Sequence, residues 1–131
     1  EVWDDVMAVN LRAPFVLTQE LLPLLEKSEN ASVVFASSGV GREARAQWGA
    51  YSVSKIAIEA VSKIFAKENT YPNIRYNCIN PGGTRTAMRA KAYPDEDPKV
   101  LPSPEAIMPA YLYLMGDDSL ALNGESIDAQ D

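Results

Sequence analysis

Ala31-Ser32-Val33-Val34-Phe35-Ala36-Ser37 is the segment from which the fold class can be inferred. It is short, almost continuously apolar and β-branched at its centre, which is typical of a parallel strand buried on both faces. A loop with glycines follows from Ser38 to Gly49, and residues 50–69 then carry apolar side chains at the spacing of an amphipathic helix. The segment therefore predicts a buried strand that leads into a helix.

The flanking segments extend this alternation of helices and strands. Residues 2–28 have the spacing of a long helix despite Pro14 and Pro23. Residues 74–79 predict a second strand, which Asn80-Pro81-Gly82-Gly83 terminates.

The rest of the chain predicts one further helix and one short strand. Residues 84–103 contain three prolines and predict a loop or a short helix. A helix is expected from Pro104 to the C-cap Gly116, with Ser103 as its N-cap. Residues 126–129 predict the last strand.

The complete order predicts an α/β protein with a doubly wound parallel sheet, helices on both faces and right-handed crossovers. We expect residues 1–131 to form a single partial domain of about three strands with three helices. A sheet this narrow would leave a long apolar edge unpaired, and Glu1-Val2-Trp3-Asp4-Asp5 resembles the interior of a helix. The sequence is therefore expected to be a truncated half of a larger domain.

Composition narrows the possible functions. The 131 residues are 47% hydrophobic and 23% charged, and the net charge of -6 disfavours nucleic acid as a partner. No run of about 18 apolar residues is present, so no membrane span is predicted. The lone Cys78 is expected to be a small buried hydrophobe in a reducing cytoplasm. The absence of histidine leaves tyrosine, lysine or carboxylates for proton transfer and predicts no metal site.

Tyr51-Ser52-Val53-Ser54-Lys55 is the strongest candidate for chemistry. Tyr51 and Lys55 are four residues apart and share one face of the predicted helix. A nearby ammonium lowers the pKa of a tyrosine from its usual value of about 10, so the phenol can act as acid or base. The alternatives are a surface pair without function and an ion pair between Lys55 and Glu59.

Two further residues could complete a site around this pair. Ser38 follows the first strand, at the end of the sheet where parallel α/β folds form their ligand crevice, and could donate to a substrate carbonyl. Its neighbour Ser37 is expected only to cap the loop. Asn10 precedes Pro14 by four residues, so its backbone carbonyl loses its helical partner and could hold a water that leads to Lys55. For Asn10 alone, a simple helix kink is the alternative.

The turn Asn80-Pro81-Gly82-Gly83-Thr84-Arg85-Thr86 ends the second strand. Its glycines let a flat ligand approach the backbone, and threonine hydroxyls can bond an amide. By itself such a turn does not indicate a function. It becomes a candidate binding segment because it follows Ser38, Tyr51 and Lys55 in the sequence.

In this order and spacing, the motifs resemble the catalytic half of the short-chain dehydrogenase/reductase family, up to the terminal Asn123-Gly124-Glu125-Ser126-Ile127-Asp128. The resemblance implies a Rossmann-like fold and an enzyme that transfers a hydride between NAD or NADP and a small carbonyl or alcohol substrate. It implies that Tyr51 is the catalytic acid/base and that Ser38 holds and polarises the carbonyl oxygen. Lys55 would lower the pKa of Tyr51 and bond the nicotinamide ribose, and Asn10 would hold the water of a proton relay.

The resemblance also implies cofactor contacts and an assembly. Residues 2–28 and 50–69 would pack across a two-fold axis into a homodimer or homotetramer. The residues expected to contact the cofactor are Tyr51, Lys55, Pro81, Gly82, Thr84 and Thr86.

Three features depart from the family pattern. The glycine-rich turn that seats the pyrophosphate and the residue that selects NAD or NADP are not found within the 131 residues. Gly39-Val40-Gly41 follows the wrong strand and lacks the third glycine. Asp128-Ala129-Gln130 stands where the family often has Asp-Gly-Gly, which we interpret as a small change near a surface turn. The fragment alone is therefore expected to be inactive.

Two other functions remain open. The chain could be a catalytically incomplete fragment that acts as a dimerisation or assembly module. A Ser-Lys hydrolase is disfavoured, because no Gly-x-Ser-x-Gly elbow surrounds Ser38.

The substrate pocket is the least predictable part of the sequence. Residues 94–104 are rich in proline and predict a lid that orders on binding. Arg89, Lys91 and residues 95–97 are expected to be solvated charges. Candidates to line the pocket are Arg45, Trp48 and Met88, although Trp48 could equally anchor an interface.

Overall fold

The computed structural model describes residues 1–130 and contains one sheet of three parallel strands. The strands are β1 (Ala31–Ala36), β2 (Ile74–Asn80) and β3 (Ser126–Asp128), in the order β1-β2-β3. Ala31 pairs with Ile74 at one end of the β1–β2 ladder, and Ala36 pairs with Ile79 at the other. The predicted α/β fold with a parallel sheet is confirmed.

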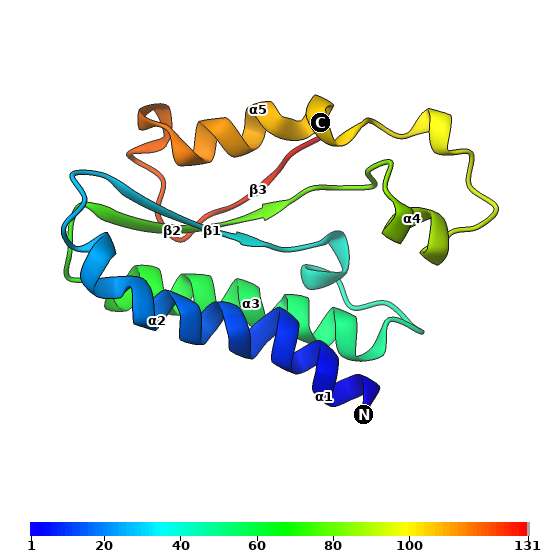
Figure 1. Ribbon diagram of the computed structural model, residues 1–131, viewed down its shortest axis with the longest axis horizontal. Coiled ribbons are helices and arrows are strands. Elements are labelled where there is room, and N and C mark those ends of the chain that lie inside the picture. The colour runs from blue at the N-terminus through cyan, green and yellow to red at the C-terminus, as the bar shows by residue number, and fades with distance from the viewer. Residues whose placement is uncertain (131) are drawn as a thin grey trace.

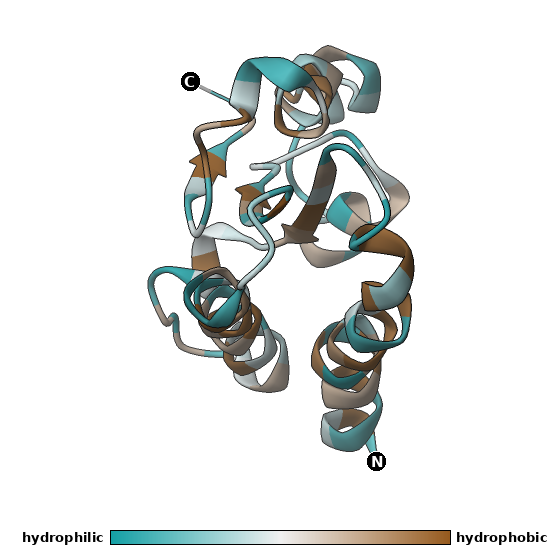
Figure 2. Cartoon of the chain, turned by 90° about the vertical axis from the view of Figure 1, so that its left-hand side faces the viewer, coloured by the Kyte–Doolittle hydropathy of each residue, from teal (hydrophilic) through white to brown (hydrophobic). Residues whose placement is uncertain are grey.

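Helices cover both faces of this sheet (Figure 1). On one face lie α2 (Ala13–Leu25) and α3 (Gly49–Glu68), and on the other lies α5 (Pro104–Met115). Figure 2 views the molecule from one end and shows the two long helical rods side by side beneath the sheet. The arrangement is the doubly wound layering that the sequence predicts.

The central strand β2 is buried on both faces but is not apolar on both. Ile74, Tyr76 and Cys78 face α3 and pack into the main hydrophobic core with Phe35 and Ile58. Burying an aliphatic or aromatic side chain of this size contributes about 1.5–3 kcal/mol. Burial raises the pKa of the Cys78 thiol to about 11, so the thiol stays protonated near neutral pH and the prediction of a small buried hydrophobe is confirmed.

Polar side chains of β2 face α5 and bond to backbone carbonyls, although the buried Arg75 Nε atom has no partner among the described residues. The Arg75 guanidinium donates to the oxygen of Gly116 at 2.6 Å and to that of Leu114 at 3.3 Å, at the C-terminal end of α5. A cation at this end of a helix is favourable because the last carbonyls carry a partial negative charge. The Asn77 amide donates to the carbonyl oxygen of Leu122 at 2.9 Å.

The helix predicted over residues 2–28 ends earlier and is not uniform. It consists of α1 (Val2–Met7), a π-helical segment, η1 (Ala8–Arg12), and α2. At the end of η1, the Ala13 N–H donates to the carbonyl oxygen of Ala8, five residues back. A widened turn of this kind accommodates Pro14, whose ring would otherwise clash with the carbonyl of the residue four positions before it.

The remaining elements are short and lie largely where the chain leaves the strands. After β1 comes the 3-10 turn η2 (Gly39–Gly41), and β2 is followed by α4 (Ala87–Ala92) and η3 (Pro98–Val100). The 3-10 turn η4 (Asp117–Ser119) follows α5. Ser103 accepts a hydrogen bond from the Ala106 N–H at 3.3 Å, which confirms it as the N-cap of α5. Within the described residues, no helix has the length and apolar character needed to cross a bilayer.

Candidate active site

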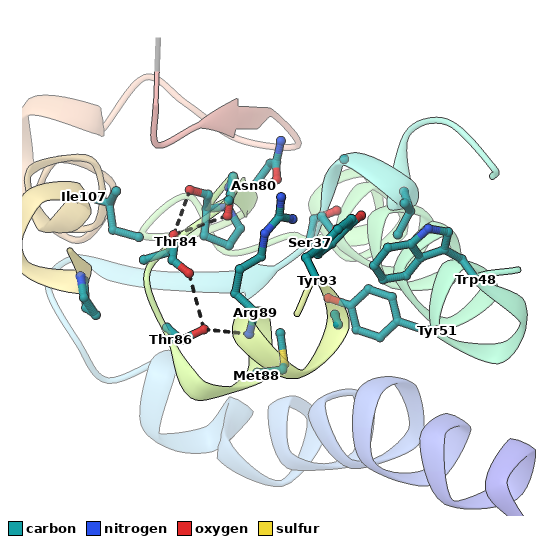
Figure 3. Close-up of a pocket in the computed structure, with 18 of the residues that line it drawn as sticks. Ser37, Trp48, Tyr51, Asn80, Thr84, Thr86, Met88, Arg89, Tyr93 and Ile107 are labelled. Atoms are coloured by element: carbon teal, nitrogen blue, oxygen red, sulfur yellow. Dashed lines mark hydrogen bonds between the residues drawn. The ribbon is translucent and has the colours of Figure 1, made fainter. Parts of the chain in front are cut away.

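A pocket of about 680 Å³ opens where β1 and β2 end, beside the start of α3 and the short helix α4. In parallel α/β sheets, ligands bind at the carboxyl ends of the strands. Ser38, Tyr51, Thr84 and Thr86 all line this pocket, so the structure brings the predicted residues of two separate motifs into one cavity. Figure 3 shows the turn after β2 at one side of the pocket and Tyr51 at the other.

Tyr51 and Lys55 lie one helical turn apart near the start of α3. The Lys55 Nζ atom is 5.6 Å from the centre of the Tyr51 ring and donates to the carbonyl oxygen of Ala36 at 2.8 Å. The ammonium is therefore bonded to the end of β1, and Lys55 is not among the residues that line the pocket. Burial lowers the pKa of Lys55 from its usual value of 10.5. The alternative ion pair with Glu59 is wrong, because Glu59 accepts from the Ser126 hydroxyl at 2.7 Å and lies 3.6 Å from Arg42.

The loop that carries Ser38 is packed directly on α3. The Ser52 hydroxyl donates to the carbonyl oxygen of Val40 at 2.7 Å. A side chain at Gly41 would meet the Lys55 carbonyl oxygen at 2.9 Å, so only glycine allows this approach. Ser38 begins the η2 turn without a side-chain capping bond, which leaves its hydroxyl available to the pocket.

Ser37 does not have the capping role expected for it. Its N–H donates to the carbonyl oxygen of Ile79 at 2.7 Å, but its buried hydroxyl oxygen has no hydrogen-bond partner among residues 1–130. Ser37 also lines the pocket. The neighbouring strand, not the loop, thus determines its position.

Asn10 reaches α3 from the π-helical segment. Its amide nitrogen donates to the Ser54 hydroxyl at 3.2 Å, and that hydroxyl donates to the carbonyl oxygen of Tyr51 at 2.7 Å. The side chain of Asn10 thus supports the backbone of Tyr51. The expected water between Asn10 and Lys55 stays a prediction.

The turn after β2 places two threonines in the pocket. Gly82 has a φ of +70°, which favours glycine, and the Thr84 hydroxyl donates toward the carbonyl oxygen of Gly82 at 3.3 Å. The Thr86 hydroxyl accepts from the Arg89 N–H at 3.2 Å and caps α4. Both threonines are therefore held by local bonds at the pocket wall.

Gln130 holds this turn from the C-terminal side, a role that the sequence did not reveal. Its amide nitrogen donates to the carbonyl oxygen of Pro81 at 2.7 Å and to that of Gly83 at 2.9 Å. A side chain at Gly82 would meet the same nitrogen at 2.8 Å. The interpretation of this position as a small change near a surface turn is wrong, because Gln130 packs on the turn itself.

Asp128, two residues earlier, anchors the base of the same turn. It accepts from the Asn80 amide at 2.7 Å and from the Arg42 guanidinium at 2.8 and 2.9 Å. The Asn80 side-chain oxygen in turn accepts from the Gly82 N–H at 3.1 Å. The hydrogen bond from Arg42, and then that from Asn80, lowers the pKa of Asp128.

Arg89 and Glu96 are not the solvated charges that the sequence indicated. Arg89 donates to both carboxylate oxygens of Glu96, at 2.6 and 2.7 Å, and its guanidinium lies 3.8 Å from the centre of the Tyr93 ring. Their hydrogen bond is the largest cause of a raised pKa for Arg89 and a lowered pKa for Glu96. The Tyr93 ring also lies tilted against that of Trp48, which the sequence did suggest as a pocket residue.

No group of three or more histidine, cysteine, aspartate or glutamate side chains that could hold a metal occurs within residues 1–130. The pocket does suit a nicotinamide. Its turn offers hydroxyl and backbone groups, which can both donate to and accept from a carboxamide. Its volume lies within the range of small-molecule and cofactor sites.

Comparison with known proteins assigns the family. The model of the short chain dehydrogenase family matches residues 1–97. The oxidoreductase YciK of Escherichia coli K12 is 58% identical over 130 residues, which cover 99% of this chain and 51% of that protein. The chain therefore belongs to the short-chain dehydrogenase family and spans about half the length of the curated relatives it matches.

Structural comparison agrees with this assignment. The crystal structure of a short chain dehydrogenase from Escherichia coli CFT073, complexed with NADPH, has a TM-score of 0.96 at 58% identity and matches 99% of this chain and 54% of its own. In sequence, a 3-oxoacyl-[acyl-carrier-protein] reductase, FabG of Thermotoga maritima, is 33% identical over 136 residues, which cover 97% of this chain and 55% of that protein. The doubly wound sheet is thus the Rossmann-like fold of this oxidoreductase family, seen here over part of its length.

Proposed function

We propose that this chain carries the catalytic half of an NAD(P)-dependent oxidoreductase that interconverts a carbonyl compound and an alcohol. The observation that carries the proposal is that Ser38, Tyr51 and the turn after β2 line one pocket, and that the Lys55 Nζ atom lies 5.6 Å from the centre of the Tyr51 ring. These groups are what a carbonyl reduction without histidine needs: a proton donor, a cation near it and a donor for the carbonyl oxygen.

In the direction of reduction, Tyr51 donates its phenolic proton to the carbonyl oxygen while Ser38 holds that oxygen. Bound nicotinamide would supply the hydride to the carbonyl carbon, and the product is an alcohol. Lys55 bonds the ribose hydroxyls, and Asn10 holds the water through which the proton is replaced. The contact between Asn10 and Ser54, at 3.2 Å, supports a role of that helix in the site.

The cofactor is NADP or NAD, held at its nicotinamide end by Tyr51, Lys55, Pro81, Gly82, Thr84 and Thr86. A relative in complex with NADPH supports this assignment. The residues that hold the phosphates and select between the two cofactors are expected outside these 131 residues, so the fragment alone is inactive.

The test is Tyr51→Phe in the full-length enzyme, assayed for NADPH-dependent carbonyl reduction. We expect turnover to be lost while circular dichroism remains that of the wild type, because only the hydroxyl is removed, and NADPH should still bind through the five other cofactor residues. Tyr113→Phe, on α5 outside the pocket, is the matched control. Undiminished turnover in Tyr51→Phe would refute the assignment of Tyr51.

A second candidate function is that the fragment acts as an assembly module. Large apolar side chains are exposed along α1, η1 and α3, which are the helices expected to pair across a two-fold axis into a homodimer or homotetramer. They include Val2, Trp3, Val9, Val53, Ile56 and Ile64. A stable dimer of the fragment in sedimentation, without affinity for NADPH, would favour this function, and a monomer would count against it.

A further inference from the structure

We infer that the substrate of this enzyme is a carbonyl compound with a flat, uncharged aromatic body, and that Trp48 and Tyr93 select it. The inference rests on the proposed function and adds the substrate class. It starts from an aromatic row beside the proposed proton donor: the Trp48 ring centre lies 5.6 Å from that of Tyr51 and 6.0 Å from that of Tyr93.

The backbone around Trp48 is unusual and keeps the indole at the pocket. Gln47 has a φ of +71° and Gly49 a φ of +41°, so two left-handed residues flank Trp48 directly before α3 begins. A left-handed conformation is uncommon for a residue other than glycine, and such residues cluster at functional sites. The turn brings the indole into the pocket three residues before Tyr51.

Tyr93 is held just as firmly from the other side. It follows α4 directly, and the Arg89 guanidinium lies 3.8 Å from the centre of its ring. Glu96 in turn holds Arg89 through two hydrogen bonds of 2.6 and 2.7 Å. The second aromatic wall is thus braced by an ion pair within residues 89–96.

The two sides of the pocket have different chemistry. Figure 3 shows Asn80 and Thr84 on one side, with Tyr51 and Trp48 on the other. The side with the turn suits the nicotinamide, which leaves the aromatic side for the body of the substrate. Flat apolar groups pack well against such rings, and the exposed Met88 in the same pocket adds an adaptable apolar contact.

The charges at the pocket favour an uncharged substrate. The Arg89 charge is already paired with Glu96. Arg45 also lines the pocket, but its side chain is 57% exposed and lies 3.9 Å from Glu43. Neither arginine offers a buried, unpaired cation to an anionic substrate.

The test compares two aldehydes of similar size in the full-length enzyme, benzaldehyde with its flat ring and cyclohexanecarbaldehyde with its puckered one. We expect kcat/KM to favour benzaldehyde. Trp48→Leu should reduce that preference by roughly two- to tenfold, mainly through KM, because one aromatic contact is lost. NADPH affinity should stay unchanged. Tyr113→Leu, an aromatic residue changed to leucine on α5 outside the pocket, is the control.

A binding measurement decides the inference without turnover. In a background that carries Trp3→Phe and the inactive Tyr51→Phe, saturated with NADP, the fluorescence of Trp48 should be quenched by benzyl alcohol and not by cyclohexylmethanol; this requires that any tryptophan outside these residues also be replaced. Equal quenching by both alcohols, or an unchanged preference in Trp48→Leu, would overturn the inference while leaving carbonyl reduction intact. A wild-type enzyme that reduces neither aldehyde would instead contradict the proposed function. The fluorescence titration with the two alcohols would still decide the inference in that case.

Discussion

Lys55 lies in α3 and contacts both the end of β1 and the Tyr51 ring. Its Nζ atom donates to the carbonyl oxygen of Ala36 at 2.8 Å and lies 5.6 Å from the centre of the Tyr51 ring. The bond to Ala36 fixes the ammonium relative to the sheet and replaces part of the water that burial removes. One backbone acceptor does not fully replace water, so burial lowers the pKa of this lysine.

This lowered pKa predicts a pH-dependent contribution to stability. Between the folded-state pKa of Lys55 and the usual value of 10.5, the unfolded chain binds more protons at this residue than the folded chain does. The free energy of unfolding should therefore rise with pH through this window, relative to a Lys55→Met variant that cannot titrate there. Urea unfolding of both proteins from neutral pH to pH 10.5 measures the difference. A difference that stays constant with pH would contradict the lowered pKa.

At the scale of elements, the site depends on loops that are pressed against regular structure. The η2 loop contacts α3 through Gly41, where a side chain would meet the Lys55 carbonyl oxygen at 2.9 Å. The turn after β2 is bonded to the C-terminal segment through Asp128 and Gln130. In both places a loop is positioned by an element that is distant in the sequence.

The close approach of η2 to α3 gives a matched pair of glycine substitutions. Gly41→Ala should lower the free energy of unfolding by about 1–3 kcal/mol, because the loop and α3 must separate to admit the methyl group. It should also reduce turnover by displacing Ser38. Gly39→Ala, two residues away, has open space around the new methyl group and is the control. Equal urea midpoints for the two variants would show that the packing is not as tight as described.

The turn after β2 predicts an effect of Gln130 on cofactor binding. Gln130→Ala removes the bonds to Pro81 and Gly83, which are 2.7 and 2.9 Å long, so the turn becomes less ordered before the nicotinamide binds. We expect the Kd for NADPH to rise by about 5- to 150-fold, since two hydrogen bonds of about 0.5–1.5 kcal/mol each are lost. Titration by NADPH fluorescence measures it, with the exposed Gln19→Ala as the control. An unchanged Kd would mean that Gln130 does not position the turn.

At the scale of the whole molecule, the helices on the two faces of the sheet expose different apolar side chains. The face covered by α2 and α3 exposes Ile64, Val53 and Ile56, whereas α5 exposes Leu112 and Met115 on the other side. The proposed assembly uses only the first of these surfaces.

The proposed interface on the α2 and α3 face predicts where an introduced carboxylate will disrupt assembly. Ile64→Asp should reduce the sedimenting mass of the full-length enzyme, because it places a carboxylate in the proposed apolar contact. Leu112→Asp on α5 should leave the mass unchanged. Ile64 is 52% exposed and Leu112 is 65% exposed, so neither change strongly perturbs the core. An assembly that resists Ile64→Asp and dissociates with Leu112→Asp would place the interface on the α5 face.

The regular part of the fold was predictable because its signals are local. The apolar run of β1 and the spacing of α3 specify burial within a few residues, and both elements lie where predicted, to within one residue at each end. The cap Ser103 and the terminating Gly116 were equally local signals. The π-helical segment at Ala8–Arg12 could not be predicted, because a pattern of apolar positions does not distinguish a widened helical turn from a regular one.

The polar residues that organise the interior could not be predicted in the same way. Arg75 lies within a buried strand, where a charged side chain is not expected. Its acceptors are the carbonyl oxygens of Leu114 and Gly116, about 40 residues later in the sequence. Gln130 and Glu96 gave no signal either, since the acceptors of Gln130 lie in the turn after β2, and Arg89 in α4 is not at a helical spacing from Glu96.

The sequence by itself determined the order of strands and helices, the residue types available for proton transfer, and the pairing of Tyr51 with Lys55 on one helical face. These follow from hydrophobic periodicity and helical geometry, which act over a few residues. Only the tertiary structure decided that Ser38, Thr84, Trp48 and Tyr93 share a pocket with Tyr51, and that Gln130 holds one of its walls. The reason is that contacts between loops depend on how strands and helices pack across the sheet, and no local pattern records that packing.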